Sequence, residues 1–125
     1  MTQVTSQEIA QFRSQLADNL TAMEALDLIE DCDGDLEDAA MTLAIRIGQQ
    51  PQIDNTEWLD SLARRWRTCI CNQEFRNDLQ NNNLKAIVEY LENIKDFPKT
   101  LATPVIMYVL KKGINNFCES FDSLN

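Results

Sequence analysis

Histidine is absent from this chain of 125 residues. It is the commonest general base in enzymes and the commonest metal ligand in proteins, so its absence excludes Ser/His and Cys/His nucleophile pairs. No Gly-x-Gly segment occurs either, which removes the glycine-rich loops that bind phosphate groups. We therefore expect a protein that is not an enzyme, that binds no cofactor and that requires no metal.

Glycine and proline are scarce, at three residues each, and long apolar runs are missing. Few turn-forming residues favour helices over a turn-rich β fold. No run approaches the roughly 18 apolar residues that a membrane helix needs, and no basic-then-apolar signal segment stands at the N-terminus. The sequence predicts an all-α protein that has no membrane contact and is located in the cytoplasm.

Basic residues are few: 11 Lys and Arg stand against 20 Asp and Glu, which gives a net charge of −9. The imbalance lies in the first half, because residues 1–50 hold ten acidic residues against Arg13 and Arg46. Phosphate contacts need Lys and Arg, so nucleic acid is not the expected partner of this half. A basic protein partner fits its charge instead.

Cysteine occurs four times, at Cys32, Cys69, Cys71 and Cys118. Without a secretory signal, reduced thiols are expected rather than disulfides. Zinc sites usually show Cys-x₂-Cys pairs, whereas Cys69-x-Cys71 would point its side chains about 200° apart on a helix. We interpret the cysteines as small hydrophobic residues and place Cys71 on a polar helix face; whether any is redox-active is left open.

Three helices are expected before residue 48, each with a start signal. The capping residues and their supports, in chain order, are Thr5 or Ser6 with Glu8, Thr21 with Glu24, and Asp35 with Asp38. Gly34 can take the left-handed conformation that ends the second helix. The third helix has an apolar stripe made of Leu36, Ala39, Ala40, Leu43, Ala44 and Ile47.

The stretch Thr21–Ile47, in which two helices flank an Asp-Gly-Asp turn, resembles the second half of ubiquitin-associated-like (UBA-like) three-helix domains. It is most similar to the N-terminal domain of translation elongation factor Ts, whose third helix also ends in a basic residue and a Gly, as Arg46 and Gly48 do here. The resemblance covers about residues 5–48 and implies a three-helix docking module. The loop Ala17–Leu20 has neither the Met-Gly-aromatic sequence of ubiquitin-binding members nor the glycines of the elongation-factor loop, so neither partner is implied.

After this module (1–48) and a connector (49–56), a helical C-terminal half is expected over 57–125, with one core shared by both halves. Its helices are predicted at Thr56–Cys71, around Phe75–Leu79, at Leu84–Ile94, from the Thr103-Pro104 cap onwards, and at Ile114–Phe121. Val105–Leu110 is apolar on almost every side, which predicts a position at the centre of a core or beneath a partner. The fold class is thus an all-α protein of six to eight helices, in which the UBA-like module packs on a C-terminal bundle.

Six acidic residues lie between Glu30 and Asp38, a density that suggests calcium. A calcium loop needs Gly at its sixth position and Glu at its twelfth; with Gly34 at the sixth, the twelfth is Ala40. We interpret the run as helix caps together with an acidic rim for a basic partner.

Met41 and Ile45 are the candidate partner-binding pair, because they lie four residues apart on the side of their helix opposite the apolar stripe. The interpretation we favour is that the C-terminal half covers them inside one core. The functional interpretation is a docking surface, with an acidic rim at Asp31 and Asp33.

The predicted function is a non-enzymatic protein–protein interaction module, a small adaptor or assembly factor of a bacterial cytoplasm. Its protein partner is unidentified and self-association is left open.

The alternative function is a nucleic-acid- or translation-associated factor. It is suggested by the elongation-factor likeness and by a secondary basic patch at Arg64 and Arg67, which flank Trp66. Trp66, however, falls on the apolar face of the predicted helix, opposite Arg67, so it cannot stack on a base that the arginines bind.

Overall fold

The computed structural model describes residues 2–49 and 57–123, and the regular elements in these ranges are helices, apart from one isolated bridge between Gln3 and Asp35. The helices are α1 (Ser6–Gln15), α2 (Leu20–Asp31), α3 (Leu36–Arg46), α4 (Trp58–Arg65), α5 (Arg67–Ile70), α6 (Gln73–Gln80), α7 (Lys85–Glu92), the 3₁₀ helix η1 (Lys99–Leu101), α8 (Ala102–Lys112) and α9 (Ile114–Ser123). The all-α prediction is confirmed, although the described part of the chain holds nine α-helices rather than six to eight. The predicted connector, apart from Gln49, lies outside the described residues.

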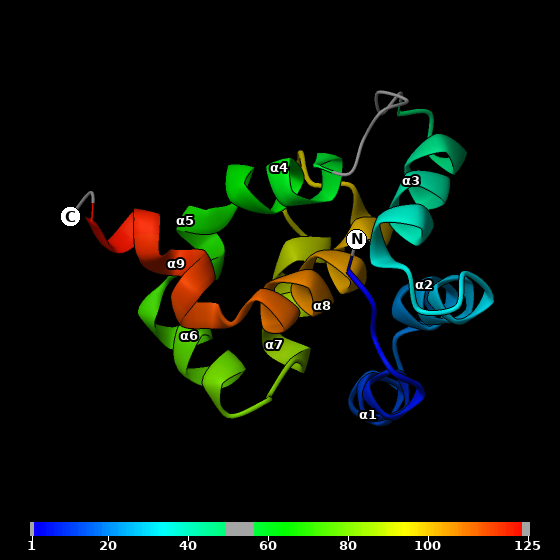
Figure 1. Ribbon diagram of the computed structural model, residues 1–125, viewed down its shortest axis with the longest axis horizontal. Coiled ribbons are helices and arrows are strands. Elements are labelled where there is room, and N and C mark those ends of the chain that lie inside the picture. The colour runs from blue at the N-terminus through cyan, green and yellow to red at the C-terminus, as the bar shows by residue number, and fades with distance from the viewer. Residues whose placement is uncertain (1, 50–56, 124–125) are drawn as a thin grey trace.

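Helix α8 lies at the centre of the fold (Figure 1). It contacts α2, α3, α4, α7 and α9, and its residues 102–109 are all buried. Of the two positions predicted for this apolar segment, the centre of a core and the site beneath a partner, the structure shows the first. Its start was predicted two residues too late, since α8 already begins at Ala102. Pro104 lies within the first turn, where the missing backbone N–H breaks no helical hydrogen bond.

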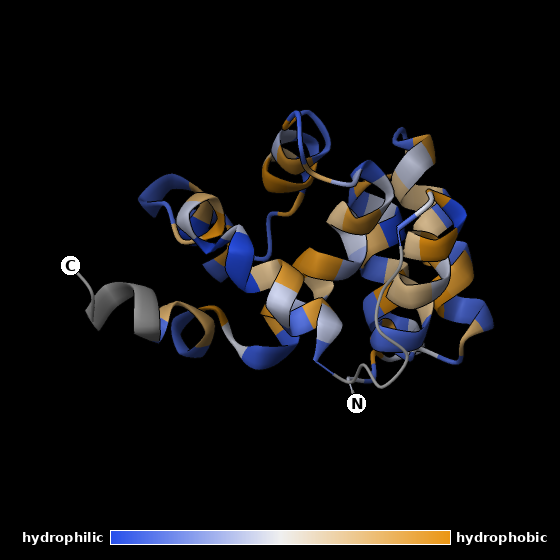
Figure 2. Ribbon diagram, turned by 90° about the horizontal axis from the view of Figure 1, so that it is seen from above, coloured by the Kyte–Doolittle hydropathy of each residue, from blue (hydrophilic) through white to orange (hydrophobic). Residues whose placement is uncertain are grey.

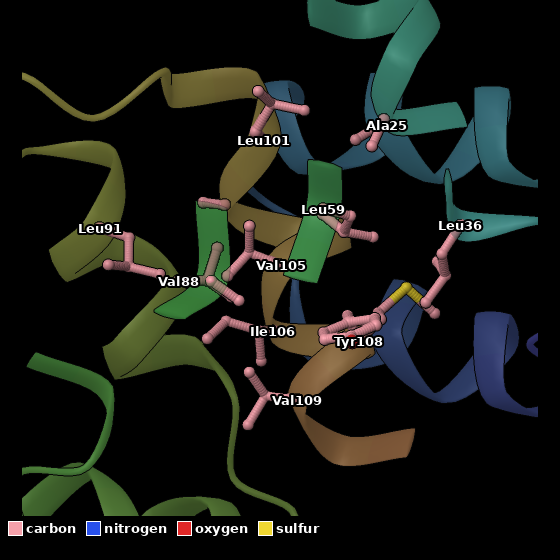
Figure 3. Close-up of a cluster of buried hydrophobic side chains, with 14 of the residues drawn as sticks. Ala25, Leu36, Leu59, Val88, Leu91, Leu101, Val105, Ile106, Tyr108 and Val109 are labelled. Atoms are coloured by element: carbon pink, nitrogen blue, oxygen red, sulfur yellow. The ribbon is translucent and has the colours of Figure 1, made fainter. Parts of the chain in front are cut away.

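One cluster of buried apolar side chains joins the first three helices to the rest of the chain. In Figure 3, Ala25 and Leu36 lie on one side of Leu59 and the α8 side chains, and Val88 and Leu91 lie on the other. Most helices carry both hydrophobic and hydrophilic residues (Figure 2), as expected for helices that bury one face. The core thus fixes the orientation of α3 relative to α4 and α8.

The first and third helix starts follow the predicted caps. The Thr5 hydroxyl accepts from the Glu8 amide at 3.1 Å, and the Thr5 amide donates to Glu8 Oε1 at 2.8 Å, which is a complete capping box. The Asp35 carboxylate accepts from the Asp38 amide at 3.1 Å. Both N-caps are confirmed, because these short polar side chains satisfy amides that the helix itself leaves free. The predicted support from Asp38 is not found, since the Asp35 amide donates to the Cys32 carbonyl at 3.1 Å instead.

The predicted cap of the second helix is wrong. Asn19 caps α2, accepting from the Ala22 amide at 3.0 Å, and Thr21 lies inside the helix. Asn is among the best capping residues, and a cap two residues earlier adds Leu20 and Thr21 to the start of α2. The same Asn19 side chain donates to Glu92 Oε1 at 2.7 Å, so the cap also ties α2 to α7.

Backbone hydrogen bonds join the N-terminal segment to the turn between α2 and α3. Gly34 has φ +84°, as the left-handed prediction requires. The Val4 amide donates to the Gly34 carbonyl and the Leu36 amide donates to the Thr2 carbonyl, each at 2.9 Å. A Cβ atom on Gly34 would overlap the Val4 carbonyl oxygen, so this close approach of two backbones needs glycine.

The helix predicted over Thr56–Cys71 is two helices, because the chain turns at Trp66 (φ −106°, ψ 15°). The Trp66 ring packs edge-on against Phe97, with ring centroids 5.5 Å apart. Tertiary packing therefore overrides the continuous helical pattern. The break changes the register that follows, so Cys71 leaves the polar face on which it was predicted and is buried.

Cys71 forms a disulfide with Cys118, with Cα atoms 5.8 Å apart, and the two residues are 4% and 0% exposed. The expectation of reduced thiols is thus wrong for this pair, while Cys32 and Cys69 are free and half-buried. The sequence places these partners 47 residues apart, and only the packing of α5 and α9 brings them together.

Candidate docking face on helix α3

Helix α3 buries one face and exposes another. The residues of its predicted stripe are buried, except Ile47, which is 43% exposed and was wrongly included. Ile47 is the C-cap, so the helical register no longer applies to it. On the opposite face Met41 is half-buried and Ile45 is 61% exposed.

The C-terminal half does not cover Ile45, contrary to the interpretation that the sequence favoured. In the C-terminal half, α4, η1 and α8 contact α3, and the face that α3 buries is the apolar stripe opposite Ile45. With Leu20, Ile47 and Tyr90, Ile45 belongs to the large apolar side chains that stay exposed in the described part of the chain. An apolar residue in the last turn of a well-packed helix therefore faces outward.

The acidic rim predicted at Asp31 and Asp33 lies at the other end of the helix. Both residues are exposed, but they precede the first turn of α3, whereas Ile45 lies in its last turn. At about 1.5 Å per residue, the axial separation is roughly 15 Å. The structure thus does not bring Asp31 and Asp33 around the apolar pair.

Asp38 is the acidic residue that the structure places beside Met41 instead. It is exposed and lies three residues before Met41, a spacing that makes two residues neighbours on a helix surface. This three-residue spacing is visible in the sequence, and it could have identified Asp38 as the acidic neighbour of Met41. Glu37 is also a neighbour by spacing, but both its carboxylate oxygens accept from Thr2, at 2.6 Å from the amide and 2.7 Å from the hydroxyl.

The first 50 residues, which carry this face, are strongly acidic. Of the two basic residues before position 50, Arg13 is engaged by Asp27 at 2.8 Å and by Glu30 at 3.1 Å. The hydrogen bond to Asp27 is the largest effect that raises the pKa of Arg13, so this cation stays with its own carboxylates. Arg46 is the remaining basic residue against ten acidic ones.

Cys32 lies close to the same end of α3 as Asp38. Partial burial raises the pKa of its thiol, and the Asp38 carboxylate raises it further. A thiol with a raised pKa is protonated at neutral pH and is a poor nucleophile. Cys32 is therefore less nucleophilic than an ordinary exposed cysteine.

The secondary basic patch at Arg64 and Arg67 is not a continuous cationic surface. The helix breaks between the two residues, and Arg64 Nε donates to Asp60 Oδ2 at 2.8 Å. The Trp66 indole Nε1 is buried without a hydrogen-bond partner. These arginines and the Trp66 indole are therefore not arranged to bind a phosphate group and stack on the adjoining base at the same time.

Two further findings concern residues 2–49 and 57–123. In these ranges, no three side chains among His, Cys, Asp and Glu converge in a way that could hold a metal ion. None of the helices described there has the length and apolarity needed to cross a membrane.

No protein-family model, curated protein or solved structure matches this chain. The likeness to UBA-like domains therefore rests on the sequence features of residues 5–48 and stays a proposal.

Proposed function

We propose that this protein is a non-enzymatic docking module that binds a basic segment of another protein through the outward side of α3. We define the α3 face as Asp38, Met41, Thr42 and Ile45. The observation that carries the proposal is the 61% exposure of Ile45 on a helix whose opposite side is fully packed. An apolar centre beside charged residues is the usual anatomy of a protein interface.

The charge of the module selects the kind of partner. Ten acidic residues against two basic ones in residues 1–50 attract a cationic chain and repel an acidic one. We expect the partner to place an apolar side chain against Ile45 and a Lys or Arg beside Asp38. Met41 supports this role, since its flexible thioether side chain adapts to the shape of a partner.

The length of the face indicates transient binding. Asp38 and Ile45 lie seven residues apart, about two helical turns, which is short compared with the surface that a permanent complex buries. A salt-sensitive association fits this description, because charged rim contacts weaken as ionic strength rises.

A titration with a defined peptide tests the proposal. The probe is a short amphipathic helix with leucine on one side and lysine along its edges, and the control peptide has glutamate in place of lysine. NMR shift changes are expected at the α3 face for the lysine peptide alone. They should be lost in the double variant Met41→Asp/Ile45→Asp and kept in Leu20→Asp, which adds a charge at another exposed apolar residue of the same module. Shift changes that map elsewhere, or that survive in the double variant, would count against the α3 face.

The UBA-like identity of residues 5–48 and a bacterial cytoplasmic setting belong to the same proposal. The Cys71–Cys118 disulfide weighs against the cytoplasm, because disulfides persist mainly in oxidising compartments. Counting alkylated cysteines in protein trapped in intact source cells tests the location. A reduced pair there supports the cytoplasm, and an oxidised pair opposes it.

The nucleic-acid alternative has less support, because Arg64 is paired with Asp60 and Trp66 packs on Phe97. A gel shift of labelled RNA or DNA at low salt decides it. Absence of a shift removes the alternative, and a salt-sensitive shift lost in Arg67→Gln restores it.

A further inference from the structure

A charged cleft lies where the N-terminal segment, α3, α4 and α8 meet. Its volume is about 280 Å³, and its walls include Glu37, Glu57, Asp60, Arg64, Tyr108 and Lys112. We propose that this cleft binds a small zwitterion, a molecule with one carboxylate and one ammonium group. The proposal does not rest on the α3 face, because none of the four residues of that face lines the cleft.

Two of the acidic residues act as scaffold. Asp60 accepts from the Tyr108 hydroxyl through Oδ1 and from Arg64 Nε through Oδ2. Burial opposes ionisation of Asp60, but these hydrogen bonds outweigh it and the pKa of Asp60 is lowered. Burial first and Asp60 second raise the pKa of Tyr108. At neutral pH the pair is therefore a carboxylate held by a protonated phenol, with Glu37 similarly occupied by Thr2.

Asp60 and two aromatic rings hold two cations in place. With Nε bonded to Asp60, the Arg64 guanidinium also lies over the Phe117 ring, 5.8 Å from its centroid. Lys112 Nζ lies 5.6 Å from the centroid of the Tyr108 ring. Within the described residues, neither the terminal amino groups of Arg64 nor the Lys112 ammonium donates a hydrogen bond. An arginine fixed through Nε presents its two terminal groups as a fork that matches a carboxylate.

Glu57 supplies the opposite charge. It is the N-cap residue of α4, its side chain makes no capping hydrogen bond, and it is exposed along the same cleft. Together with Glu37 and Asp60 it makes the cleft unfavourable for a doubly charged anion such as phosphate. A zwitterion matches the charges of both walls: its carboxylate contacts Arg64 and Lys112, and its ammonium group contacts Glu57.

The size of the cleft points to a molecule with few atoms. Sites for drug-sized ligands range over about 300–1,000 Å³, so 280 Å³ lies just below that range. The ligand class is therefore a small amino acid or a short ω-amino acid. The roles of the side chains are binding roles only, since nothing in the cleft pairs a nucleophile with a base.

Titration of the isotope-labelled protein with four probes tests the assignment. L-serine and 4-aminobutanoate carry both charges, acetate carries only the negative one, and inorganic phosphate carries excess negative charge. We expect shift changes at Arg64, Tyr108 and Lys112 with at least one zwitterion, at a concentration at least tenfold below that needed for acetate or phosphate. Equal response to acetate would overturn the zwitterion assignment, and no response to any probe would overturn the site.

Matched variants locate the binding. Lys112→Gln and Glu57→Gln change exposed residues, so both are expected to fold with unaltered melting temperatures and to weaken zwitterion binding at least tenfold. Lys111→Gln is the control, because Lys111 is ion-paired with Glu8 at 2.9 Å and does not line the cleft. Binding that is unchanged in Lys112→Gln and Glu57→Gln would refute the proposal, as would an equal loss in Lys111→Gln.

Discussion

Reduction of the Cys71–Cys118 disulfide should lower the stability of this protein more than any single exposed substitution. The bond joins residues 47 positions apart and so closes a loop that includes α6, α7 and α8. The chain-entropy relation gives a loop of this length a stabilisation of about 4 kcal/mol at 25 °C, within the usual 2–5 kcal/mol for loss of a native disulfide. Against the roughly 5–15 kcal/mol that holds a typical domain folded, that is a large share.

The assay is urea unfolding followed by far-UV circular dichroism, with and without dithiothreitol. For a chain of this size each kcal/mol corresponds to roughly 4 °C, so when the same samples are heated the melting temperature should fall by about 16 °C on reduction. The variant Cys32→Ser/Cys69→Ser is the control, because it removes the two free thiols and keeps the bond. It should show the same loss when reduced.

Helix α9 should respond first to reduction. Besides the bond, it is held by contacts with α5, α6 and α8, and its buried side chains include Ile114 and Phe117. Hydrogen exchange of its amides should rise on reduction more than that of α2. Four reactive thiols in the denatured but unreduced protein would show that the bond is absent. An unfolding midpoint that reduction does not move would show that the bond does not stabilise the fold.

Two further predictions concern single positions. Gly34→Ala should lower the free energy of unfolding by more than the roughly 1–2 kcal/mol that a positive φ costs by itself, because its Cβ would overlap the Val4 carbonyl oxygen. Gly48→Ala is the matched control: its φ is +83° but its surroundings are open, so urea unfolding should show the conformational cost alone. Burial is the main reason that the pKa of Glu92 is raised above 4.5. Its contribution to stability is therefore fully present below about pH 4.5 and is lost as pH rises through the folded pKa. Glu92→Gln keeps an acceptor for Asn19 and should gain stability relative to wild type above that range, while equal stability at pH 7 and pH 4 would contradict the burial argument.

Local signals predicted much of the fold. The Thr5 and Asp35 caps and the left-handed Gly34 follow from hydrogen bonding and backbone sterics within a few residues, and such effects are readable from sequence. The central position of α8 follows from a segment with no polar face. These features depend little on what lies far along the chain.

Features that depend on distant partners could not be predicted in this way. The break at Trp66 is stabilised by Phe97, and the disulfide of Cys71 needs α9 beside α5. The exposure of Ile45 was left undecided for the same reason, because a sequence shows that a residue lies off the stripe but not whether another helix covers it. The cleft around Asp60 is lined by residues from four segments of the chain, so no local sequence motif predicts it.

The proposed binding of a partner by the outward side of α3 depends on Met41 and Ile45. Quantitative affinity capture from source-cell lysate tests this with three baits: wild type, Met41→Asp/Ile45→Asp, and Leu20→Asp. The double variant should keep the wild-type melting temperature within about 4 °C, because Ile45 is 61% exposed, Met41 is half-buried, and two surface changes of up to roughly 0.5 kcal/mol each amount to about 1 kcal/mol. It should also lose a basic partner that Leu20→Asp retains. A double variant that unfolds, or that stays folded and retains every wild-type partner, would contradict the docking role of Met41 and Ile45.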